Sequence, residues 1–132
     1  MGKKIILVVE DQPDIRKLIR MTLEFGEYEI HEANNGELGL HMVHGLRPDL
    51  VLLDVMMPGA LDGFQVCAQV KANPLIRHTP VVMLTARGQQ SDFEAGKIAG
   101  ADGYLTKPFS PLELIDKVAD LLRRQDQATK AA

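Results

Sequence analysis

A run of four consecutive apolar residues, Leu50 to Leu53, ends in the carboxylate of Asp54, and a turn proline, Pro58, follows shortly after. A segment of this length that is apolar at every position is typical of a strand covered on both faces, as in parallel sheets. An aspartate at the end of such a strand lies at the carboxyl edge of the sheet, where open α/β folds bind their ligands. Asp54 is therefore either a functional carboxylate or an ordinary loop cap, and the other strand ends bear on the choice.

Further strands and helices are predicted along the whole chain. Apolar or alternating segments predict four more strands, at Ile5–Val9, Tyr28–Ala33, Val81–Leu84 and Gly103–Thr106. The alternation in Tyr28–Ala33 indicates weaker burial, near an edge of the sheet. Apolar residues at helical spacing follow each strand. Five strands alternating with five helices predict an α/β fold, a doubly wound five-stranded parallel sheet with helices on both faces and right-handed crossovers.

Local signals place several helix ends. Asp62 with Gln65, and Ser110 with Glu113, match the capping box that opens a helix, and the turn Asn34-Asn35-Gly36 supplies a helix cap. The apolar pattern of the last helix stops at Leu122, two arginines follow, and no pattern continues beyond them. We therefore predict one domain over residues 1–124 and a polar, disordered C-terminal tail over 125–132.

Length and composition exclude several classes of function. The 132 residues suffice for one domain with its own core. The net charge of −3 argues against direct binding of nucleic acid, because there is no excess of cationic residues to neutralise phosphates. The one cysteine cannot form an internal disulfide, which suits a reducing compartment. No apolar run is long enough for a signal peptide or a membrane span, so we expect a cytoplasmic protein with no membrane partner.

The predicted strand ends carry a set of chemically active side chains. In a parallel sheet all carboxyl ends meet at one edge, so the topology brings together Glu10, Asp11, Asp54, Thr85 and Lys107. Converging carboxylates repel, and a bound cation relieves the repulsion. Oxygen ligands with room for water favour Mg²⁺, and no His or Cys accompanies them to recruit zinc. The alternative is a structural salt bridge between Lys107 and Asp54, with the other acids solvated.

These groups suit one reaction in particular. A divalent cation, an amine, a hydroxyl and a free carboxylate are the components that phosphoryl transfer to an aspartate requires. The sequence therefore indicates a site for phosphoryl chemistry centred on Asp54.

Four motifs, in order, resemble one known family. They are VVEDQP at 8–13, LLDVMMP at 52–58, LTA at 84–86 and AGADGYLTKPF at 99–109. Together they are similar to the receiver domain of bacterial response regulators, the CheY-like family, over about residues 4–124. This resemblance implies a flavodoxin-like fold with the strand order 2-1-3-4-5, a role as the phosphoacceptor of a two-component system, and no turnover of a substrate.

The resemblance also implies a role for each site residue. Asp54 would take the phosphoryl group from a phosphohistidine of a sensor histidine kinase or phosphotransfer protein. Mg²⁺ would be bound by the side chains of Asp11 and Asp54, by Glu10 through water and by the backbone carbonyl of Met56. Thr85 would hydrogen-bond the phosphoryl group and Lys107 would pair with it. Small Ala86 would leave the pocket open, and Lys107-Pro108 would be a cis peptide.

The output of such a switch would lie on another face. With Thr85, Tyr104 matches the aromatic residue that reports phosphorylation to the surface of the fourth helix, fifth strand and fifth helix, where an unknown downstream protein or output domain would bind. The protein is expected to be a monomer or a weak dimer.

Two departures from the family pattern concern the pocket. The loop Gly59–Gly63 is one residue longer than the commonest form, which would alter the mouth of the pocket. Met56 and Arg87 occupy positions that tune how easily water reaches the acyl phosphate, so the lifetime of the phosphorylated state is open.

Two other functions compete with this interpretation. A phosphatase or phosphotransferase of another α/β family would use Asp54 as nucleophile, but such enzymes usually have a second carboxylate two residues later, where Met56 stands. An interaction module that never takes phosphate would be expected to have lost one of the five site residues.

Cys67 is expected to be a core thiol, and His41 and His44 to be solvated helix positions, not metal ligands.

Overall fold

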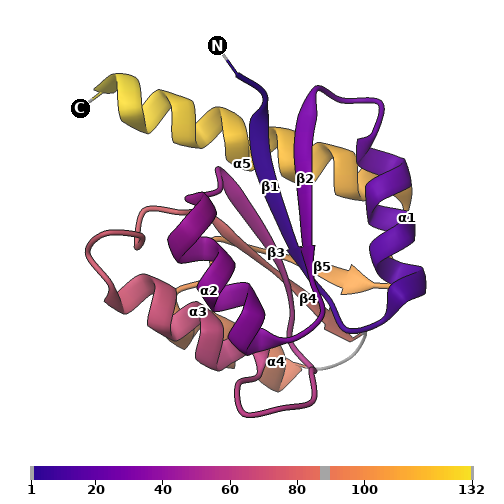
Figure 1. Ribbon diagram of the computed structural model, residues 1–132, viewed down its shortest axis with the longest axis vertical. Coiled ribbons are helices and arrows are strands. Elements are labelled where there is room, and N and C mark those ends of the chain that lie inside the picture. Colours follow the sequence, from indigo (N-terminus) through magenta and orange to yellow (C-terminus); the bar gives the residue numbers. More distant parts are fainter. Residues whose placement is uncertain (1, 87–89, 132) are drawn as a thin grey trace.

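The computed structural model describes residues 2–86 and 90–131, where five strands alternate with five helices as predicted (Figure 1). The strands are β1 (Lys4–Val9), β2 (Tyr28–Ala33), β3 (Leu50–Asp54), β4 (Val81–Ala86) and β5 (Gly103–Lys107). The helices are α1 (Pro13–Leu23), α2 (Gly36–Leu46), α3 (Gly63–Ala72), α4 (Gln90–Ala99) and α5 (Pro111–Ala131). None of these helices is both long and apolar enough to cross a membrane.

The strands form one parallel sheet in the order β2-β1-β3-β4-β5. This confirms the order that the resemblance implies, and it places β2 at an edge as the alternation in Tyr28–Ala33 predicts. The chain moves outward from β1 to β2 and then crosses back to β3 on the other side of β1. The reversal opens a crevice at the carboxyl ends of β1 and β3, the place where folds of this kind bind ligands.

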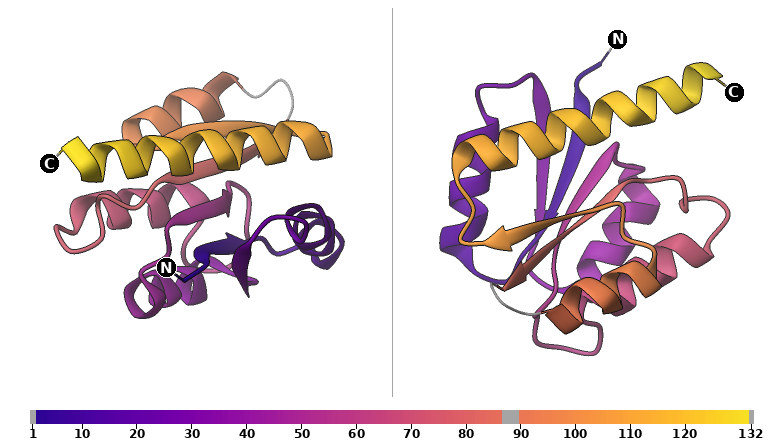
Figure 2. Two further views of the ribbon diagram at one scale, coloured as in Figure 1. Left: turned by 90° about the horizontal axis from the view of Figure 1, so that it is seen from above. Right: turned by 180° about the vertical axis from the view of Figure 1, so that it is seen from behind.

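Helices cover both faces of the sheet and enclose two apolar cores. Successive strand residues point to opposite faces. In β1, Ile6 and Val8 pack with α1 and α5, whereas Leu7 and Val9 pack with α2, α3 and α4. Figure 1 shows α2 and α3 in front of the sheet, and α5 lies in front of it in the reverse view of Figure 2. The central run Leu50–Leu53 is at most 1% exposed, which confirms burial on both faces.

The local capping signals are confirmed. Asp62 Oδ1 accepts a hydrogen bond from the Gln65 amide at 2.9 Å, and the Gln65 side chain accepts one from the Asp62 amide at 2.8 Å. Ser110 and Glu113 form the same reciprocal pair at 3.1 and 3.2 Å. Asn35 caps α2 by accepting from the Leu38 amide at 2.8 Å. These bonds join residues three apart, which is why sequence spacing finds them.

The end of the chain differs from the prediction of a disordered tail. Helix α5 continues to Ala131 and extends past the sheet (Figure 2). Residues 125–131 contain neither Gly nor Pro to stop a helix and consist largely of good helix formers. An ion pair of 2.8 Å between Lys4 Nζ and Asp126 Oδ1 also ties this extension to the start of β1. The absence of an apolar stripe therefore does not end the helix, and the domain boundary at 124 stays a prediction.

A carboxylate completes the hydrogen bonding where β1 begins, and its removal should weaken the fold. Asp49 Oδ2 accepts from the Ile5 amide at 2.7 Å, and the Asp49 amide donates to the Ile5 carbonyl at 2.8 Å. We expect Asp49→Ala to lower the free energy of unfolding by about 1–2 kcal/mol, because the half-buried Ile5 N–H loses its acceptor. Asp49→Asn keeps an acceptor oxygen and should lose less. Urea denaturation measures both, and equal losses would contradict this account.

Candidate functional site

The predicted residues meet at the carboxyl edge of the sheet. Asp54 is the last residue of β3 and is 3% exposed, while Glu10, which follows β1, and Thr85 of β4 are fully buried. Lys107 ends β5. Carboxylate oxygens of Glu10, Asp11 and Asp54 all lie within 4.8 Å of one another. The parallel topology therefore assembles the cluster that the strand ends predict.

Lys107 neutralises part of this negative charge. Its Nζ lies 2.6 Å from Glu10 Oε1 and 3.1 Å from Asp54 Oδ1. The simple alternative of one Lys107–Asp54 bridge with solvated acids does not describe the site, because Glu10 is fully buried and shares the lysine. Burial lowers the pKa of Lys107, but the two carboxylates more than compensate and raise it overall. The amine therefore stays charged.

Without a bound cation, the surroundings of Asp54 disfavour its ionised form. Burial, together with the hydrogen bond and negative charge of Glu10, raises the pKa of Asp54 from 3.8 to about 8, while the charge of Lys107 opposes this shift. Asp54 Oδ1 accepts a hydrogen bond from the Met56 amide at 3.2 Å, which fixes the carboxylate on the loop that follows it. Further positive charge near Asp54 would favour its ionised form.

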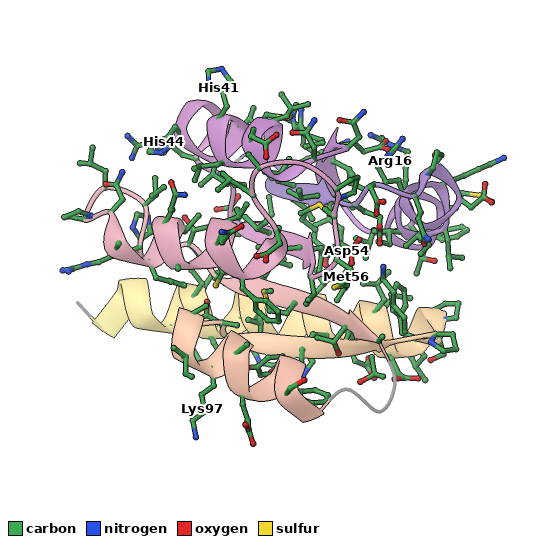
Figure 3. All side chains as sticks on the ribbon, turned by 90° about the horizontal axis from the view of Figure 1, so that it is seen from below. Arg16, His41, His44, Asp54, Met56 and Lys97 are labelled. Atoms are coloured by element: carbon green, nitrogen blue, oxygen red, sulfur yellow. The ribbon has the colours of Figure 1, made fainter. Side chains whose placement is uncertain are left out.

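A small cavity opens at this cluster. It has a volume of about 180 Å³ and is lined by Asp11, Gln12, Asp54, Met56, Leu84, Ala86 and Lys107. Figure 3 shows Asp54 and Met56 side by side at this edge, while His41 and His44 project from α2 elsewhere. Both histidines are exposed, as expected for solvated positions. Arg87, the other position predicted to tune water access, lies outside the described residues.

The donor set fits a divalent cation such as Mg²⁺. Three carboxylates converge on one point, and burial, with the hydrogen bond and charge of Glu10, raises the pKa of Asp54 although Lys107 opposes the shift. Oxygen ligands beside a cavity with room for water are what Mg²⁺ prefers. The acidic cluster is thus of the type that holds a divalent metal.

The hydroxyl of Thr85 stands out as a buried polar group. Among the described residues, no donor or acceptor forms a hydrogen bond with its Oγ1. An unpaired buried hydroxyl destabilises a fold by about 1–3 kcal/mol. Its presence at this edge of the sheet therefore suits a hydrogen bond to a group that binds at the site.

Removing this hydroxyl should therefore stabilise the folded protein. We expect Thr85→Val, which keeps the shape of the side chain, to raise the free energy of unfolding by about 1 kcal/mol. The register partner in β5, Thr106, is only half-buried, and Thr106→Val serves as the control with little expected change. Chemical denaturation of both variants is the measurement, and a loss of stability in Thr85→Val would show that the hydroxyl is paired.

Tyr104 packs inward against α4. Its hydroxyl donates to the Phe93 carbonyl at 3.2 Å, and the two rings meet edge to face with centroids 5.3 Å apart. Cys67 is fully buried nearby in the same core, where burial raises the pKa of its thiol to about 11, as befits a structural cysteine. The Lys107-Pro108 peptide is cis, as the resemblance implies.

Two residues that the sequence analysis does not single out also support the site. Arg16 Nη1 donates to the Glu10 carbonyl at 2.8 Å, and its Nε pairs with Glu32 at 3.1 Å. Glu37 of α2 accepts a hydrogen bond from the Leu61 amide, in the loop after Asp54. Neither belongs to a motif with fixed spacing, so only the packing of α1 and α2 brings them to the site.

A doubly wound parallel sheet with an acidic pocket at its switch point defines the CheY-like class of α/β proteins. The model of the response regulator receiver domain family matches residues 6–119, and the chain belongs to this family. It is thus the receiver domain of a two-component response regulator, a signalling module and not a turnover enzyme.

Individual relatives agree with this assignment. The chain is 45% identical over 124 residues to the transcriptional regulatory protein ResD of Bacillus subtilis, covering 94% of this chain and 50% of that protein. It is 42% identical over 127 residues to the DNA-binding dual master transcriptional regulator RpaA of Synechocystis, covering 96% and 52%. The chain therefore spans about half the length of these curated relatives.

Solved structures agree as well. The chemotaxis response regulator CheY4 of Vibrio cholerae superimposes with a TM-score of 0.84 at 31% identity, covering 91% of this chain and 99% of that one. A CheY-like receiver domain protein from Methanospirillum hungatei superimposes with a TM-score of 0.88 at 27% identity, covering 96% and 99%.

Proposed function

We propose that Asp54 is the phosphoacceptor of this receiver domain and that it takes its phosphoryl group from a phosphohistidine of a sensor histidine kinase or phosphotransfer protein. The observation that carries this proposal is the environment of Asp54. Its carboxylate lines a cavity of about 180 Å³, lies 3.1 Å from an ammonium group and belongs to a cluster of three acids. Glu10 contacts Lys107 but does not line the cavity, and Asp11 lines the cavity but forms no ion pair with Lys107 among the described residues, whereas Asp54 does both.

The transfer exchanges one phosphorus bond for another. An Asp54 oxygen attacks the phosphorus, the new P–O bond forms as the P–N bond breaks, and the electron pair of that bond returns to the imidazole nitrogen of the partner. Lys107 is placed to pair with a phosphoryl oxygen once its bridge to Asp54 is disrupted, and Thr85 offers an unpaired hydroxyl from the adjacent strand. Asp54 must be ionised to act, so a cation at the cluster favours the reactive form.

Mg²⁺ is the cation that the donors suit best. The side chains of Asp11 and Asp54, the backbone carbonyl of Met56 and, through water, Glu10 would hold it. When bound it supplies positive charge that stabilises the oxygens of the transferred group.

A second cavity suits the approach of the kinase. It measures about 350 Å³ and is lined mainly by apolar side chains of α1 and the loop after β5: Gln12, Ile15, Leu18, Ala86, Lys107, Pro108 and Phe109. It shares Gln12, Ala86 and Lys107 with the acidic pocket. If an apolar helix face of the partner bound there, its histidine would lie beside Asp54. Because the donor is a kinase of this system, we also propose that the protein acts in the cytoplasm.

The response would reach a downstream partner through Tyr104. In the present state its hydroxyl is held by the Phe93 carbonyl of α4. Thr85 and Tyr104 lie on adjacent strands, so a shift of Thr85 toward a phosphoryl group would leave Tyr104 and α4 free to rearrange. The affected face comprises α4, β5 and α5.

Mass spectrometry of the intact protein tests this function directly. Incubation with a small phosphodonor and Mg²⁺ should add one phosphoryl group, and chelation of the metal should reduce the uptake strongly. Absence of any adduct with Mg²⁺ present, or steady turnover of a phosphomonoester in its place, would overturn the proposal.

A further inference from the structure

The loop that follows Asp54 is fastened at its far end to α2. The Leu61 amide donates to Glu37 Oε1 at 2.8 Å. The other oxygen of the same carboxylate lies against Gly59, where a Cβ would come within 3.2 Å of Oε2. One side chain in the first turn of α2 therefore bonds to one residue of the β3–α3 loop and lies close to a second.

The loop and the helix also meet at backbone distance. A Cβ built on Gly36, the residue before Glu37, would overlap the Leu61 carbonyl oxygen and lie 3.0 Å from the Leu61 Cβ. Only glycine permits this approach. The hydrogen bond and the close contact act on the same residue, so Leu61 is fixed from two sides.

Between this point and the pocket, most residues of the loop are exposed. Met56 bonds to Asp54 through its amide, and Met57 is buried. Residues 58–60 are exposed. An exposed loop loses conformational freedom when it is ordered, so a fixed far end lowers the cost of ordering it for binding.

We propose that Glu37 is a positioning residue for the phosphoacceptor pocket, which holds Leu61 so that the Asp54–Met56 end of the loop is preorganised for the divalent cation. The inference rests on the proposed function of Asp54 and Met56 and adds a residue of α2 to that site. Preorganisation acts by removing the ordering cost that binding would otherwise carry. Loss of the Glu37 hydrogen bond should weaken cation binding, but it should not change phosphoryl uptake once the cation is bound.

Three proteins test the proposal: wild type, Glu37→Ala and Glu37→Gln. Calorimetric titration with MgCl₂ should show about fivefold weaker binding in Glu37→Ala, the factor that one lost hydrogen bond supports. Glu37→Gln keeps an acceptor oxygen and should stay within about twofold of wild type. Both variants remove the same charge from the helix N-terminus, so that effect cancels in the comparison.

Two further readouts separate positioning from a general loss of stability. Phosphoryl uptake at saturating Mg²⁺ should be equal in the three proteins, with the difference confined to low Mg²⁺. Hydrogen exchange of the Leu61 amide, followed by NMR without metal, should be faster in Glu37→Ala than in Glu37→Gln.

Wild-type Mg²⁺ affinity in Glu37→Ala, or an equal loss in both variants, would overturn the inference while leaving the phosphoacceptor role intact. If wild type takes no phosphoryl group, the proposed function fails instead, and the Mg²⁺ titration with the Leu61 exchange still decides whether Glu37 positions the loop.

Discussion

Asp54→Asn is expected to take up no phosphoryl group and, without a divalent cation, to be more stable than wild type at pH 8 by on the order of 3 kcal/mol. The substitution removes the nucleophilic oxygen but keeps a side chain of the same shape. It also removes a buried carboxylate that Glu10 and Asp11 crowd, while Lys107 keeps its 2.6 Å contact with Glu10. Function and stability should therefore change in opposite directions.

The pH dependence follows from the raised pKa of Asp54. Its usual value is 3.8 and its value in the folded protein is about 8. Between these pH values the folded state binds more protons at Asp54 than the unfolded state does, so this group makes the free energy of unfolding fall as pH rises through the window. The variant lacks the group. The two proteins should be close in stability near pH 4, and the gap should be widest at pH 8.

Urea denaturation in EDTA across this pH range measures the effect. Adding Mg²⁺ should stabilise wild type more than the variant, because a cation that binds only the folded state adds to its stability. For phosphoryl uptake, Asp116→Asn on the exposed face of α5 is the matched control and should take up one group as wild type does. A less stable Asp54→Asn at pH 8, or an adduct on it, would contradict the site.

Gly63→Ala is expected to lower the free energy of unfolding by about 2–4 kcal/mol, because no space exists for even one methyl group. A Cβ at Gly63 would overlap the carbonyl oxygen of Asp54 and lie 2.8 Å from the Val55 Cα. These are backbone atoms, which cannot rotate out of the way as the end of a flexible side chain can. The Gly63 amide also donates to the Val55 carbonyl at 3.0 Å, so α3 starts in direct contact with the strand end that carries Asp54.

Gly45→Ala provides the control for this substitution. Gly45 is an exposed residue of α2 with no atom within 4 Å of a built Cβ. Alanine has a higher helix propensity, so this variant should gain up to about 1 kcal/mol. Denaturation curves of the two variants should move in opposite directions, and Gly63→Ala should also slow phosphoryl uptake. A Gly63→Ala protein as stable as wild type would show that α3 can shift freely.

Some features of this protein could be predicted because they depend on short stretches of sequence. The apolar run Leu50–Leu53 specifies a strand buried on both faces, and the pair Asp62 and Gln65 specifies a helix start. Once strands and helices alternate, the parallel sheet follows, and with it the meeting of strand ends. The helical segment at the C-terminus has a local explanation too: an apolar stripe reports where a helix packs, not where it ends, and residues 125–131 lie past the sheet.

Other features depend on contacts between distant segments. Glu37 and Leu61 are 24 residues apart, and nothing in the spacing of either one indicates the bond between them. The sequence predicts the loop and the helix separately, but not the contact between them. Likewise, Arg16 supports Glu10 only because α1 packs beside β2, where Glu32 orients the guanidinium.

Polarity patterns within about ten residues are enough to predict the succession of strands and helices and the side chains at the strand ends. Three features of the site are set by contacts across the fold: Lys107 pairs with both Glu10 and Asp54, the hydroxyl of Thr85 has no partner among the described residues, and Glu37 bonds to the loop. These contacts depend on distances of a few ångströms between segments far apart in the chain. Burial lowers the effective dielectric constant and so strengthens the electrostatic interactions at those distances.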